Sequence, residues 1–171
     1  MIQREGMVLS PYIALYDIII PKDHELRQLN ELVDFSFVDD MLRDTYTLDN
    51  GRPGYRPQVM FKYLMLKRMY ELSDRDVVSR AMTDMAFKYF LGIAPEADVI
   101  DPSSLTKFRK QRMKDDTIMD TLIARSVAIA RENGIKTICK NPPSRHVKSW
   151  IYLRCILFIG QIKYAQGLPH T

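Results

Sequence analysis

The chain has 171 residues, of which 46% are hydrophobic and 27% charged, a balance typical of a globular chain that buries a core. Its two cysteines form no CxxC motif and its three histidines lie far apart, so the sequence predicts neither a disulfide framework nor a metal site. The net charge of +4 is uneven, because residues 133–171 hold six basic side chains and no acid, which leaves 19 basic against 21 acidic side chains in the first 132 residues. Evidence for a nucleic-acid partner must therefore come from local clusters of charge.

The N-terminal quarter of the chain favours short elements. Residues 11–20 fit either a short apolar helix or a strand. Pro21 then begins a predicted helix, in which apolar side chains recur at helical spacing: Leu26, Leu29, Leu32 and Val33.

A second helix is predicted from Ser36, which we expect to be its N-cap, with Asp39 three residues later as its capping partner. The predicted apolar face of this helix consists of Val38, Met41, Leu42 and Tyr46. Residues 49–54 then form a loop, because Asn, Gly and Pro dominate them.

The most apolar helix is predicted to begin at Pro57. Apolar side chains cover almost every side of residues 59–70, and only Lys62, Lys67 and Arg68 interrupt them. A helix that is apolar nearly all round packs against several neighbours, so this one is expected at the centre of the core.

A tight turn at residues 72–74 follows, and Ser73 with Asp76 forms a predicted capping pair. The next helix is predicted to extend to Gly92, with an apolar stripe of Val77, Val78, Ala81, Met82 and Met85. Two helices joined by so short a turn resemble a helix-turn-helix.

The next predicted helix is basic. Asp101 is its expected N-cap, Pro102 its first residue, and Leu105 and Phe108 anchor it in the core. Its remaining surface is rich in Lys and Arg, which suits it to lie against the phosphates of a nucleic acid. The alternative is a basic surface helix that contacts only solvent. The predicted DNA contacts are Ser103, Ser104, Thr106, Lys107, Arg109, Lys110 and Arg112, with Arg75 and Arg80 of the preceding helix as weaker candidates.

A long helix with apolar residues between Ile118 and Ala130 is expected to stop at Asn133-Gly134. The predicted fold is all-α: a compact multi-helix domain with a helix-turn-helix-like core over residues 13–134, followed by an irregular, acid-free tail over 135–171. No signal peptide is recognisable, and the longest apolar run near the C-terminus is broken by Arg154. We therefore expect no membrane partner and a cytoplasmic location.

Five strings in this order resemble the N-terminal, InsH-like domain of bacterial insertion-sequence transposases of the DDE type. They are IPKDHELRQLNELVDFSFV (20–38), NGRPGYRPQVMFKYLMLK (50–67), LSDRDVV (72–78), DMAFKYFLGIAPE (84–96) and DPSSLTKFRKQRMKD (101–115). The resemblance covers roughly residues 13–136. It implies a helical domain that recognises the terminal inverted repeats of the element in double-stranded DNA, so that the protein is nucleoid-associated when bound.

The resemblance also implies a ribonuclease-H-like catalytic domain downstream. In such relatives the long helix leads into a strand that ends in the first catalytic Asp. Here that place reads Ile135 to Lys140, no Asp follows Asp120, and no Glu follows Glu132. Because paired divalent ions need carboxylate ligands, we expect no catalytic residue, no metal and no cofactor in this chain, and Mg²⁺ only in a full-length relative.

Three interpretations remain open from the sequence. The chain is a DNA-binding part of a transposase that is truncated or frameshifted near residue 135, a non-enzymatic regulator that competes with full-length transposase or pairs with it, or an inert remnant. The reading frame downstream of residue 135 distinguishes them, because an out-of-frame tail would be followed by a restored carboxylate-bearing strand in another frame. Besides DNA, the expected partners are a second copy of the chain or full-length transposase.

Overall fold

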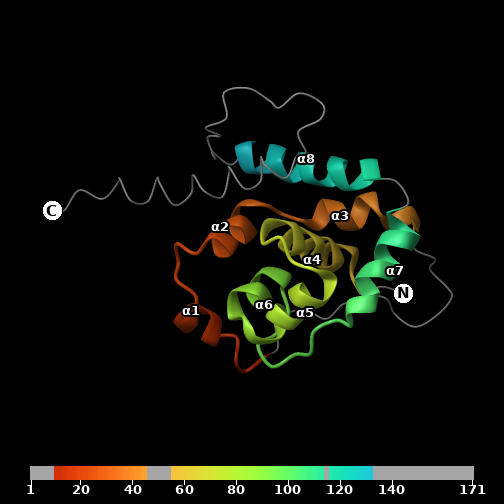
Figure 1. Cartoon of the computed structure of the whole chain (residues 1–171). Coiled ribbons are helices and arrows are strands. Elements are labelled where there is room, and N and C mark those ends of the chain that lie inside the picture. The colour runs from red at the N-terminus through yellow and green to blue at the C-terminus, as the bar shows by residue number, and fades with distance from the viewer. Residues whose placement is uncertain (1–9, 46–54, 114–115, 133–171) are drawn as a thin grey trace. The chain divides into compact units, whose positions relative to one another are not determined.

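The computed structural model describes residues 10–45, 55–113 and 116–132, and all the regular secondary structure within them is helical (Figure 1). This confirms the predicted all-α class. The described residues divide into two compact units: residues 10–21 with 35–113, and residues 22–34 with 116–132. The predicted tail, Tyr46 and the loop at 49–54 lie outside the described residues. No helix among those described is long and apolar enough to cross a membrane.

The first unit contains most of the helices. In chain order they are α1 (Leu15–Ile19), α3 (Ser36–Met41), the short 3-10 helix η2 (Arg43–Thr45), α4 (Pro57–Met69), α5 (Asp74–Thr83), α6 (Met85–Leu91) and α7 (Pro102–Arg112). The second unit contains α2 (Glu25–Leu32) and α8 (Asp116–Glu132), which lie against each other.

Helix α4 is the centre of the first unit, as its apolar pattern predicts. It contacts α3, α5, α6 and α7, and its residues 60–66 are all buried. Even Lys62 is buried, with its ammonium nitrogen 4.8 Å from the ring centroid of Phe35 and 5.1 Å from that of Phe90. The two aromatic faces attract the positive charge, which helps the helix to be enclosed on all sides.

The predicted capping role of Ser36 is wrong. The N-cap of α3 is Phe35, which makes no side-chain cap bond, and Ser36 is the first helical residue. Asp39 instead accepts a hydrogen bond from the backbone N–H of Gln58 at 3.0 Å and pairs with Arg56 at 2.9 Å. The Arg56 side chain has no acceptor for the first N–H groups of α4, so a carboxylate from another helix supplies one.

The capping pair of Ser73 and Asp76 is confirmed as a reciprocal capping box at the start of α5. The prediction of a single helix from there to Gly92 is wrong, because α5 ends at Asp84 and a new helix begins. The carboxylate of Asp84 is the N-cap of α6 and accepts hydrogen bonds from the backbone N–H groups of Ala86 and Phe87. Gly92 ends α6 with φ 73°, a left-handed conformation that favours glycine. The predicted core residues Met82 and Met41 are instead exposed, at 63% and 46%.

The loop between α6 and α7 is held by a buried lysine. The ammonium group of Lys88 donates hydrogen bonds to the carbonyl oxygens of Pro95 at 2.6 Å and Ala97 at 2.8 Å. The hydroxyl of Tyr16 on α1 donates to the carbonyl of Ile93 at 2.6 Å. These bonds fix the loop that leads into α7.

Replacing Lys88 by methionine is expected to lower the free energy of unfolding by about 1–2 kcal/mol, because the part-buried carbonyl groups of Pro95 and Ala97 lose their donor. Thermal unfolding followed by circular dichroism measures the change. Lys22→Met, at an exposed lysine outside this loop, is the control and should leave the melting temperature unaltered. Equal melting of the two variants would show that the Lys88 bonds contribute nothing.

In the second unit, α2 begins at Glu25 rather than near the predicted Pro21. Its N-cap is His24, whose Nδ1 accepts a hydrogen bond from the backbone N–H of Leu26 at 3.2 Å. Leu26 and Leu29 are buried, as their spacing predicts. On α8 the buried residues include Leu122 and Ile123.

Candidate nucleic-acid interface

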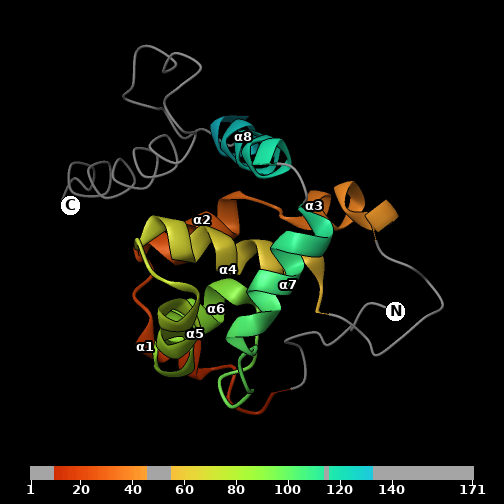
Figure 2. The same ribbon diagram turned by 45° about the vertical axis from the view of Figure 1, so that its right-hand side comes forward.

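Helix α7 forms as the sequence predicts. Asp101 accepts a hydrogen bond from the backbone N–H of Ser103 at 2.8 Å, and Pro102 occupies the first turn, where no N–H is required. Leu105 and Phe108 are buried at 0% and 5% exposure and anchor the helix. It lies beside α4 and α5, at the right-hand edge of the unit in Figure 1 and at the front of the unit in Figure 2.

One side of α7 faces solvent. Ser103, Lys107, Lys110 and Gln111 are all exposed, and their spacing places them within roughly 100° of the helix circumference. These four residues are called the exposed stripe below. Residues 102–112 contain four basic side chains and no acid, so the stripe carries positive charge with no carboxylate on the same helix.

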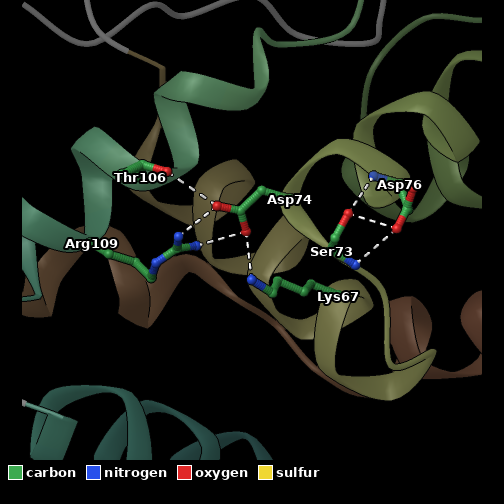
Figure 3. Close-up of polar contacts among 6 residues, drawn as sticks. All are labelled: Lys67, Ser73, Asp74, Asp76, Thr106 and Arg109. Carbon is green, nitrogen blue, oxygen red and sulfur yellow. Dashed lines mark hydrogen bonds and ion pairs between the residues drawn. The ribbon is translucent and has the colours of Figure 1, made fainter.

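Two of the predicted DNA contacts on α7, Thr106 and Arg109, bind a carboxylate from another helix. Arg109 donates to both oxygens of Asp74, from Nη1 at 3.0 Å and from Nη2 at 2.5 Å, and the hydroxyl of Thr106 lies 3.2 Å from Oδ2 (Figure 3). Lys67, near the end of α4, donates a hydrogen bond from its ammonium nitrogen to Oδ1 of Asp74 at 2.6 Å. Asp74 is the first residue of α5, so one side chain joins α4, α5 and α7. These four residues are called the Asp74 cluster.

The charge of Asp74 is strongly favoured. Hydrogen bonds from Arg109, and then from Lys67, hold the pKa of its carboxyl group well below its ordinary value, although burial opposes them. Its side chain is 19% exposed, against 36% for that of Arg109. A bidentate, partly buried pair of this kind is stronger than an exposed surface ion pair.

The other predicted contacts lie in varied surroundings. Arg75 is exposed on α5, and Ser104 and Arg112 are half-buried on α7. Arg80 pairs with Asp84 at 3.1 Å, and its guanidinium lies 4.5 Å from the ring centroid of Phe87 and 4.7 Å from that of Tyr70. Arg80 is therefore packed onto the junction of α5 and α6.

The transposase domain family DUF772 matches residues 14–111, a segment from α1 to the last turn of α7. The chain belongs to this family of transposase domains. Membership of this family indicates a role related to transposition. No curated protein and no solved structure matches it.

Two features of this transposase domain escaped prediction. Gln111 lies on the exposed stripe. Its position four residues after Lys107 places both side chains on the same face of the helix, so the sequence could have indicated it. Asp74 lies 35 residues from Arg109, and nothing local indicates that the two side chains meet. The structure therefore brings together Ser103, Lys107 and Lys110 on one side, and joins Thr106 and Arg109 to Asp74 on another.

Proposed function

We propose that the first unit of this transposase domain binds double-stranded DNA through the exposed stripe of α7, and that its target is the terminal inverted repeats of the encoding element. The observation that carries the proposal is the exposure of Lys107 and Lys110 on a helix with no acid among residues 102–112. The family adds support, because a transposase acts on the ends of a DNA element.

The chemistry of the stripe divides into two tasks. The ammonium groups of Lys107 and Lys110 pair with phosphates and supply attraction that does not depend on sequence. The Gln111 amide can donate and accept together at an adenine edge in the major groove, and the Ser103 hydroxyl can also contact a base. From Ser103 to Gln111 the helix rises about 12 Å, which is close to the width of that groove.

Replacing Lys107 by glutamine is expected to weaken DNA binding and to reduce the magnitude of the slope of log K against log salt concentration by about 1, because one phosphate contact is lost. Fluorescence anisotropy with a terminal-repeat duplex at several salt concentrations measures both quantities. Lys22→Gln removes an exposed lysine outside α7 and should keep the wild-type slope.

The same titration with a scrambled duplex tests recognition of the repeats. Wild-type protein should bind the terminal repeats more tightly than the scrambled duplex at equal salt concentration. Equal affinities would reduce the proposal to general attraction between cations and phosphate, and an unchanged slope for Lys107→Gln would remove α7 from the interface.

A further inference from the structure

The Asp74 cluster limits which cations of α7 can meet DNA. Asp74 accepts hydrogen bonds from both terminal guanidinium nitrogens of Arg109 and from Lys67, while Lys107 and Lys110 stay exposed. Arg109 would have to leave a bidentate, partly buried ion pair before it could bind a phosphate. Lys107 and Lys110 are already exposed to solvent, although Lys107 also attracts the nearby carboxylate of Asp101.

We infer that Asp74 is a positioning residue for the DNA contacts, and this inference rests on the proposed function. Its carboxylate fixes α7 against the ends of α4 and α5, so that the exposed stripe keeps one orientation, and it withholds Arg109 from phosphate. The three donors reach it from α4 and from two successive turns of α7, which restrains both the tilt and the rotation of α7 (Figure 3).

Electrostatics and positioning have opposite effects on the affinity for the terminal repeats when the negative charge of Asp74 is removed. By electrostatics alone, Asp74→Asn would strengthen binding to every DNA, because repulsion falls and Arg109 is released. By positioning, the variant loses contacts that need a fixed α7, and those contacts carry the preference for one sequence. We therefore expect binding to scrambled DNA to hold or rise, and the preference for the terminal repeats to fall about tenfold.

The experiment uses the full chain with a duplex of the terminal inverted repeats and a scrambled duplex, at two salt concentrations. Asp74→Asn and Arg109→Gln should each lower the ratio of the two affinities about tenfold, and the double variant should fall no further, since both changes break one interaction. Asp74→Glu, which retains the charge, should recover part of the ratio. Arg109→Gln should keep the wild-type salt slope on scrambled DNA.

Asp76→Asn is the matched control. Asp76 lies two residues along the same helix and is bonded to Ser73 rather than to α7, so its removal changes the charge equally and should leave the ratio unaltered (Figure 3). Circular dichroism establishes that each variant is folded, and Arg109→Gln decides the matter if Asp74→Asn does not fold.

Two results would overturn the inference while the proposed function stands. One is a wild-type ratio in Asp74→Asn. The other is a rise in affinity for both duplexes in Asp74→Asn, with a shallower salt slope in Arg109→Gln, which would make Asp74 a competitor of phosphate. If wild-type protein itself shows no preference for the repeats, the proposed function fails and the inference fails with it.

Discussion

Replacing Phe61 by alanine is expected to lower the free energy of unfolding by about 3–5 kcal/mol, because it removes a large, fully buried side chain. Phe61 has no exposed surface, lies in the middle of α4, and its ring centroid is 6.3 Å from that of Phe35. Truncation removes apolar contacts and leaves a cavity among helices that pack on α4 from several sides. Leu64→Ala, at 3% exposure, should cost about 2–5 kcal/mol.

Urea unfolding at neutral pH measures both values. Ile18→Ala is a suitable control, because Ile18 is 77% exposed on α1 and its truncation should change stability by less than about 0.5 kcal/mol. If the Phe61 and Leu64 variants unfold at the same urea concentration as the control, α4 does not have the central place that the structure gives it.

The second large effect depends on pH. Asp74→Asn is expected to cost about 2–3 kcal/mol at pH 7, somewhat less than the loss of one partner from a fully buried ion pair, because the carboxylate is 19% exposed. The folded-state pKa of Asp74 lies below its value of about 4 in the unfolded chain. The stabilisation by Asp74 is therefore complete above about pH 4 and is lost as the pH falls further toward the folded-state pKa.

The measurement is the free energy of unfolding of wild type and Asp74→Asn between pH 7 and pH 2. The difference between them should stay constant down to about pH 4 and narrow below it. Arg109→Gln should also lie below wild type at pH 7 and approach it in acid, since it breaks the same pair. A constant difference down to pH 2 would show that the charge of Asp74 does not stabilise the fold.

The sequence predicts the parts of the fold that depend on neighbouring residues. The apolar surround of α4, the capping box of Ser73 and Asp76, the helix end at Gly92 and the N-cap of α7 at Asp101 are all confirmed. Each is encoded within a few residues, because helix propensity, capping and burial of one face act over one or two turns.

Two of the failures, the capping role of Ser36 and the unbroken helix through Asp84, share one physical cause: an Asp side chain bonds a partner that its local pattern did not indicate. Asp39 reads as a partner for Ser36 but bonds the first turn of α4. Asp84 reads as part of a continuing helix but caps a new one. An Asp side chain reaches several N–H groups at similar cost, so packing decides among them.

The candidate site divides in the same way. Helical periodicity places Lys107 and Lys110 correctly on the solvent side, since the buried Leu105 and Phe108 define the opposite side. Periodicity cannot show that Thr106 and Arg109 face an acid from another helix. A list of cations drawn from the sequence therefore overstates the number that are exposed to solvent.

The bond between Tyr16 and Ile93 also affects the order of folding during synthesis. Helix α1 leaves the ribosome before the carbonyl group that its tyrosine binds, which is 77 residues further along the chain. The partner of Ser10, Glu96, is 86 residues further along. At the usual rate of translation, the synthesis of the 77 residues between Tyr16 and Ile93 takes roughly 4 to 15 seconds. During this time the nascent chain exposes the Tyr16 side chain, so a chaperone could bind the apolar segment around α1.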